Sequence, residues 1–261
     1  MLSDVLIGID MGTGSSKGVA TTITGEILAT STRPRPNSMS MPRPGWAEVD
    51  ADAIWWADVV SLSRELTARV ADHQLAGVCV SGVGPCLVLC DENDRPVRPA
   101  ILYGIDMRAT AEIEELTERY GQQAILDRGG TALTTQAVGP KALWVRRNEP
   151  EVWARASYWF NSNSYIAKRL TGEYILDHHP PASATRSTTF MPTTGIDPGV
   201  KMSCRVLPCR GWRGRLRLSG RSPPQPLTRP VCPQGHQCVL ALSMPGLRPS
   251  APECDAQETS C

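Results

Sequence analysis

Residues 5–20, VLIGIDMGTGSSKGVA, decide how the rest of the chain is interpreted. Residues 5–9 form a short apolar run, which predicts a strand buried on both faces. Gly12 and Gly14 then allow a tight turn and a close approach of the backbone to a ligand. The β-branched residues in 19–23 predict a second strand that returns from this turn.

The predicted turn carries side chains that suit a phosphate site. Thr13 and Ser15 supply hydroxyl groups, Lys17 supplies a positive charge, and a glycine turn directs backbone N–H groups toward one point. Asp10, at the end of the first strand, can hold a metal ion directly or through water. An ordinary hairpin with a Gly-rich turn is the alternative that these residues alone leave open. A Walker loop is excluded, because no Gly-Lys-Ser/Thr follows a four-residue spacer.

Three later segments accompany this turn in a fixed order: residues 99–102 (PAIL) before Asp106 and Arg108, residues 140–144 (PKALW), and residues 170–172 (LTG). Together with the turn they resemble the FGGY carbohydrate kinases, a branch of the actin-like ATPases. The resemblance implies an α/β, actin-like (ribonuclease H-like) domain. Its mixed sheet would have three antiparallel strands followed by parallel strands, with helices on both faces.

The family enzyme transfers the γ-phosphoryl group of ATP to a sugar hydroxyl with magnesium, in a cleft between two actin-like domains. For this chain the resemblance implies ATP-dependent phosphorylation of a ketopentose or a related polyol, with xylulose as the leading candidate. It gives Asp10 the catalytic role of orienting a metal-bound water. It assigns the phosphates to five residues: Gly12, Thr13, Gly14, Ser15 and Lys17.

The predicted sugar contacts lie in two loops. In the family the loop at residues 82–85 carries polar side chains, but here it reads GVGP, so Gly84 and Pro85 would contact the substrate through the backbone or accept a different sugar. The resemblance places Asp106 near sugar hydroxyls and gives Arg108 a bracing role. From the residues alone, Asp106 could instead be a helix cap with an ion pair. Lys141 is predicted to be a solvated or loop-bracing charge rather than a catalyst.

The net charge of +1 is the sum of an acidic part, residues 1–199, and a basic part, residues 200–261. Residues 1–199 carry 18 Lys and Arg against 23 Asp and Glu, so they offer no basic face for nucleic acid. The sequence contains no run of about 18 apolar residues, so it predicts no membrane span. The N-terminus lacks a basic start followed by an apolar core. These features predict a cytoplasmic protein that binds a small-molecule sugar and ATP, with no membrane or nucleic-acid partner.

Residues 200–261 have a different composition. They hold six of the nine Cys and nine of the 22 Pro, and no helical or strand period runs through them. We therefore divide the chain into an actin-like domain, 1–199, and a low-order, disordered tail, 200–261. The composition is typical of GC-rich codons read out of frame. A zinc site is the alternative, disfavoured by the loose spacing of its five candidate ligands, Cys204, Cys209, Cys232, His236 and Cys238.

The family's catalytic base is an Asp in a Gly-rich loop beyond residue 199, and residues 200–261 contain no such loop. We therefore expect a truncated, inactive form that lacks the second domain and the base. A non-catalytic sugar- or phosphate-binding module and an actin-like scaffold are the alternatives. An apolar face left open by a missing domain would favour a homodimer.

Overall fold

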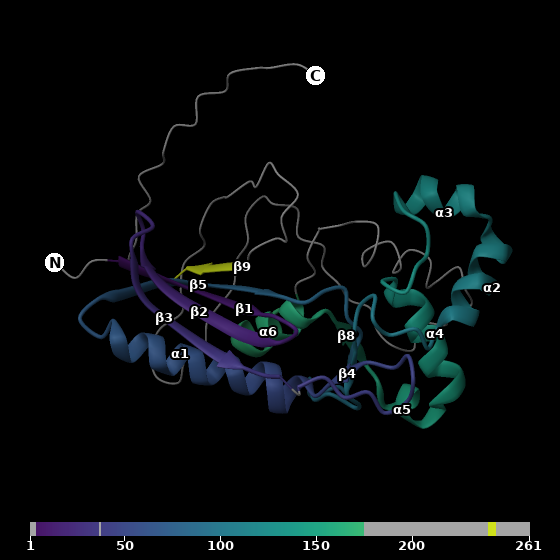
Figure 1. Cartoon of the computed structure of the whole chain (residues 1–261), viewed down its shortest axis with the longest axis horizontal. Helices are drawn as coiled ribbons and strands as arrows, with labels where there is room; N and C mark the ends of the chain where they lie inside the picture. Colours follow the sequence, from purple (N-terminus) through teal and green to yellow (C-terminus); the bar gives the residue numbers. More distant parts are fainter. Residues whose placement is uncertain (1–3, 37, 175–239, 244–261) are drawn as a thin grey trace, which may run out of the picture.

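The computed structural model describes residues 4–36, 38–174 and 240–243. Figure 1 shows a twisted sheet with α1 (Ala57–Arg69) running along it. The helices α2 to α5 lie at the end of the molecule away from the N-terminus. The predictions of a disordered tail and of a zinc site fall outside the described residues, apart from 240–243.

The main sheet has the strand order β3-β2-β1-β5-β9. β1 (Asp4–Met11), β2 (Ser15–Thr22) and β3 (Ile27–Pro34) are antiparallel neighbours, and β5 (Gln74–Gly82) pairs with β1 in parallel. The predicted mixed sheet is therefore confirmed. β9 (Leu240–Ser243) pairs antiparallel with β5. This strand was not predicted, because the composition of residues 200–261 indicated disorder, although residues 239–242 (VLAL) form a short apolar run.

The remaining elements connect the sheet to the helical end. Two short sheets pair β4 (Glu48–Val49) with β7 (Ala100–Ile101) and β6 (Val88–Cys90) with β8 (Tyr158–Phe160). The helices besides α1 are a π-helical turn (Ala51–Trp56), α2 (Thr110–Tyr120), α3 (Gln122–Gly129), α4 (Val138–Asn148), α5 (Pro150–Arg155) and α6 (Ser162–Thr171). α4 ends at Asn148, and Pro150 begins the next helix, α5, since proline is favoured in the first turn.

β1 buries only one face, so the predicted burial on both faces is wrong. Ile7 and Ile9 are at most 2% exposed, whereas Leu6 is 40% exposed. The pairing aligns Leu6 with Thr21 of β2 and Thr21 with Ile27 of β3, which is 65% exposed. An unbroken apolar run cannot by itself tell a strand covered on both faces from one whose outer positions also happen to be apolar.

The buried face of the sheet is covered by α1 and α6. Leu62 and Leu66 of α1 lie over Gly18, where an added Cβ would be 2.7 Å from Leu66 Cδ1. Ser162 of α6 lies against Gly82 on the same face. Val59, Leu62 and Leu66 of α1 are all buried in this core. Helices on the opposite face stay a prediction.

A second apolar cluster joins the helical end to the short sheets. It includes Leu87 and Leu89 near β6, Leu116 of α2, and Val138 and Val145 of α4. No helix within the described ranges is long and apolar enough to cross a membrane.

Candidate functional site

Strand pairing places four polar side chains in one row on the exposed face of the sheet. Asp10 of β1 pairs with Lys17 of β2 and with Ser81 of β5, and Lys17 pairs with Thr32 of β3. Residues directly opposite each other on neighbouring strands share a face. The row therefore joins two predicted site residues, Asp10 and Lys17, to two that the sequence interpretation missed. The available signal for Ser81 was its position at the end of the apolar, β-branched run of residues 75–81.

Ser81 fixes the carboxylate of Asp10. Its hydroxyl donates to Asp10 Oδ1 at 2.6 Å, and Oδ2 receives no donor among the described residues. An exposed carboxylate with one open oxygen fits Mg²⁺, which binds oxygen ligands and usually keeps several waters. The part of the chain that the structure describes contains no group of three or more His, Cys, Asp or Glu that could hold a metal.

The turn between β1 and β2 is tight at one end and open at the other. Gly12 N donates to Ser15 O at 2.9 Å. A Cβ on Gly12 would lie 2.8 Å from Ser15 O, so this position requires glycine. Gly14 is exposed, and a Cβ there would meet no atom within 4 Å. The space beside Gly14 is therefore open to a ligand.

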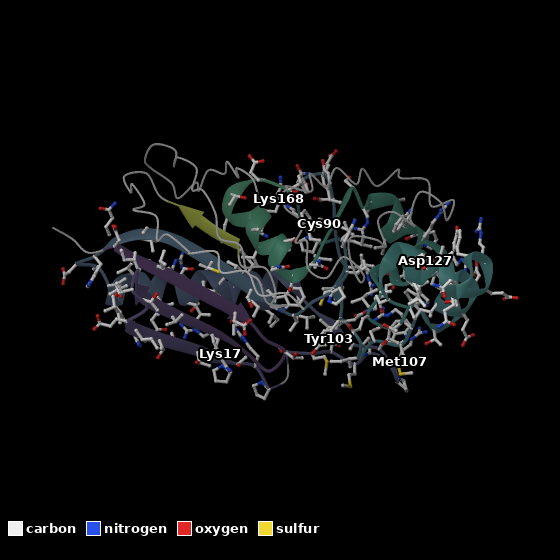
Figure 2. The ribbon with its side chains drawn as sticks, turned by 90° about the horizontal axis from the view of Figure 1, so that it is seen from above. Lys17, Cys90, Tyr103, Met107, Asp127 and Lys168 are labelled. Atoms are coloured by element: carbon white, nitrogen blue, oxygen red, sulfur yellow. The ribbon has the colours of Figure 1, made fainter. Side chains whose placement is uncertain are left out.

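Two neighbouring segments hold this turn from outside. Arg35 N donates to Gly14 O at 2.8 Å, and Ser38 Oγ donates to Thr13 O at 3.2 Å. Thr13 Oγ1 lies 3.5 Å from the Tyr103 hydroxyl. Figure 2 shows the side chains labelled Lys17 and Tyr103 along the same edge of the molecule. The turn at residues 12–15 and the loop after β7 therefore meet at this edge. The sequence interpretation had not singled out Tyr103.

The loop at residues 82–85 adjoins the same turn. Val83 N donates to Met11 O at 3.0 Å, and the Ser162 hydroxyl of α6 donates to Val83 O. Gly84 is half-buried with open space where a Cβ would be, whereas Pro85 is buried. Only the backbone near Gly84 is thus well placed to contact a ligand, and contact by either residue stays a prediction.

Asp106 and Arg108 form a buried ion pair. Asp106 is 1% exposed, and Arg108 Nη2 lies 2.7 Å from its Oδ2. Arg108 Nε donates to Oδ1 at 2.9 Å, and Ala47 N donates to Oδ2 at 2.7 Å. Both carboxylate oxygens thus have donors within the protein. The geometry favours a bracing role for this pair, and a direct sugar contact by Asp106 stays a prediction.

The same guanidinium connects several segments of the chain. Arg108 Nη1 donates to Glu48 Oε1 at 2.8 Å, and its Cζ lies 4.1 Å from the centre of the Trp46 ring and 5.1 Å from that of Trp144. Arg98 also pairs with Glu48, and burial lowers the pKa of its guanidinium. Charges buried in this way need such partners to be tolerated.

Residues 5–190 match the family model described as the N-terminal domain of the FGGY family of carbohydrate kinases. The chain belongs to this family. The FGGY domain is 34% identical over 169 residues to a xylulose kinase of Lactococcus lactis subsp. lactis, covering 64% of this chain and 33% of that protein. The chain thus spans about a third of the length of this curated relative.

Solved structures support the fold of the FGGY domain. A xylulose kinase from Rhodospirillum rubrum superposes with a TM-score of 0.64 at 33% identity, covering 69% of this chain and 37% of that one. A gluconate kinase from Lactobacillus acidophilus gives a TM-score of 0.63 at 26% identity, covering 69% and 36%. The actin-like α/β class predicted from the sequence is therefore confirmed.

Lys141 of the FGGY domain is buried, with 1% exposure, so the solvated alternative for this residue is wrong. Burial lowers the pKa of its ammonium from 10.5 to about 8. The cause is the loss of water around the charged form, which nearby Cys86 and Asp106 only partly offset.

This lowered pKa predicts a dependence of stability on pH. Above about pH 8 the unfolded FGGY domain binds more protons at Lys141 than the folded one, so the contribution of Lys141 to the free energy of unfolding rises with pH. Between pH 7 and 9 the gain is about 1 kcal/mol. Urea denaturation of wild type and Lys141→Met at both pH values measures it. Equal pH dependence of the two proteins would contradict the prediction.

The comparison stops at pH 9 because buried thiols act in the opposite direction. Burial raises the pKa of Cys86 to about 12 and that of Cys79 to about 11, from 9.0. From about pH 8 upward, the unfolded chain loses these protons first, and the folded state loses stability. Subtracting the Lys141→Met curve from the wild-type curve removes this shared contribution.

Proposed function

We propose that this chain carries the ATP-phosphate and sugar-binding domain of a carbohydrate kinase. The observation that carries the proposal is the row of Asp10, Lys17 and Ser81 beside the open turn at residues 12–15. The row brings a cation, a carboxylate and free backbone to one edge, which is what a metal–phosphate complex needs. Membership of the FGGY family supports the same assignment.

Each residue of the site has a distinct proposed task. The backbone at Gly14 and the hydroxyls of Thr13 and Ser15 cradle phosphate oxygens, and Lys17 neutralises part of their charge. Asp10, oriented by Ser81, holds a water of the magnesium ion. Magnesium, when bound, neutralises charge on the phosphoryl group that is transferred.

For the acceptor we propose a ketopentose, because xylulose kinases are prominent among the relatives. A similar likeness to a gluconate kinase keeps related polyhydroxy compounds in the test. We propose binding without turnover by this chain alone. Residues 200–261 contain no Gly-rich loop bearing an Asp like the family's general base.

Replacing Asp10 with asparagine is expected to weaken binding of MgATP about tenfold, which corresponds to about 1.4 kcal/mol. Binding of ATP without magnesium should change less, because the carboxylate acts through the metal. Isothermal titration calorimetry measures both. The control is Asp127→Asn, which alters an exposed carboxylate of α3 far from Lys17 in Figure 2. Equal losses with and without magnesium would contradict the role of Asp10.

Turnover is measured separately, as ADP release with xylulose, gluconate or glycerol. Binding of MgATP and a sugar without ADP release supports the proposed binding domain. ADP release that depends on a sugar would instead show that this chain is a complete kinase. MgATP binding with no response to any sugar would favour the actin-like scaffold.

A further inference from the structure

Lys141 is a buried charge with no ion pair to its ammonium within the described residues. Its Nζ donates to Leu102 O at 2.8 Å and to Thr135 O at 2.6 Å. A buried ammonium is costly, and a methionine of similar length could fill the same space. What a methionine could not replace is the pair of hydrogen bonds that the Lys141 ammonium donates to the Leu102 and Thr135 carbonyl oxygens.

The two carbonyls belong to segments that flank the loop after β7. Leu102 is the last residue before Tyr103, and Thr135 Oγ1 also donates to Gly104 O at 3.0 Å. On the far side of the loop, Asp106 is fixed by Arg108 and Ala47 N. The loop at residues 103–105 is thus held on both sides, at Leu102 and at Asp106.

Tyr103 lies in this loop, and its side chain reaches the turn at residues 12–15. Its hydroxyl lies 3.5 Å from Thr13 Oγ1. Leu102 is completely buried, while Tyr103 beside it is half-buried. Any shift of the Leu102 carbonyl would therefore be passed directly to the neighbouring Tyr103 and to its distance from Thr13.

We propose that Lys141 is a positioning residue that holds Tyr103 against the phosphate turn by fastening the Leu102 and Thr135 carbonyls together. Its value for ligand binding rests on the proposed function, whereas the positioning itself does not. Lys141 thereby links the packing of α4 to the position of Tyr103 beside the turn at residues 12–15.

The test is carbonyl-¹³C labelling of the five tyrosines, with Tyr103 and Tyr174 assigned from Tyr103→Phe and Tyr174→Phe. In Lys141→Met the Tyr103 signal should move by more than its line width, while the Tyr174 signal stays. The matched control is Lys168→Met. Lys168 Nζ lies 4.0 Å from the Tyr174 ring centre, and Figure 2 shows it on the edge opposite Tyr103. Of the two assigned signals, this variant should therefore move only that of Tyr174.

A general loss of stability would affect tyrosines in both regions. A Tyr103 signal that is unmoved in Lys141→Met, or that moves no more than Tyr174, would overturn the proposal. If Lys141→Met does not fold, the wild type is titrated from pH 7 to 9. The Tyr103 signal should then shift with a midpoint near the lowered pKa of about 8, and a flat response would overturn the proposal.

Three groups near Lys141 bear on the titration. The Cys86 thiol has its pKa raised to about 12, so it keeps its proton at pH 9. Asp106 and Arg108 are paired with each other. In a separate experiment, the Tyr103 signal of the wild type is measured with and without MgATP. A failure of MgATP to move Tyr103 counts against the proposed function, whereas the ligand-free spectra decide the role of Lys141.

Discussion

Replacing Arg108 with methionine is expected to lower the free energy of unfolding by about 3 to 5 kcal/mol, which is the range for removing one partner of a buried ion pair. The change would leave the carboxylate of Asp106 with backbone donors alone in a site that is 1% exposed. It would also remove the link to Glu48 and the cation held beside Trp46. Urea denaturation followed by tryptophan fluorescence measures the loss.

A matched arginine is available on the surface. Arg147 pairs with Glu115 at 2.6 Å, but its side chain is 45% exposed, so Arg147→Met should cost at most about 1 kcal/mol. Arg108→Lys should not restore stability, because an ammonium cannot reproduce the forked contact with Asp106 or lie flat beside an indole. Similar losses in the two methionine variants would contradict the buried-network interpretation.

Replacing Gly12 with alanine is expected to lower the free energy of unfolding by about 1 to 3 kcal/mol, the usual range for forcing an atom into a packed site. The new Cβ would lie 2.8 Å from Ser15 O, which is backbone and cannot rotate away. The turn must then open, and the Gly12 N to Ser15 O hydrogen bond is lost. Denaturation measures the loss, and calorimetry with MgATP shows whether the deformed turn still binds.

Gly14→Ala is the control for stability in the same turn. A Cβ at Gly14 would meet nothing within 4 Å, and its backbone needs no positive φ, so the folded state should tolerate alanine. Less freedom in the unfolded chain should even stabilise it slightly. Comparable losses in both variants would show that the close contact at Gly12 is not the cause.

The local part of the site could be predicted from the sequence. Asp10, Gly12 and Lys17 lie within one hairpin, where spacing along the chain fixes spacing in the structure. Ser81, Thr32 and Tyr103 reach the site through strand pairing and loop packing. No spacing rule connects such distant positions, so these residues appeared only with the fold.

The loop that carries Asp106 shows a second limit of prediction from the sequence. Its motif predicted an important carboxylate but could not state whether the oxygens face a ligand or the protein. The answer depends on Ala47 N, which donates to Asp106, and on Glu48, which holds Arg108. Both come from a segment more than 50 residues earlier, so the local pattern contains no information on them.

The order of the strands also bears on how the site forms during folding. The β1–β2–β3 meander needs only short loops to close, so the pair of Asp10 and Lys17 can form early. Ser81 joins only after β5 pairs with β1 across the intervening helix, which is a slower, non-local step. Pairing of β5 with β9 joins residues as distant as Cys79 and Ala241 and should come last. A chain emerging from the ribosome therefore forms the turn at residues 12–15 first, and the hydroxyl that orients the Asp10 carboxylate arrives later.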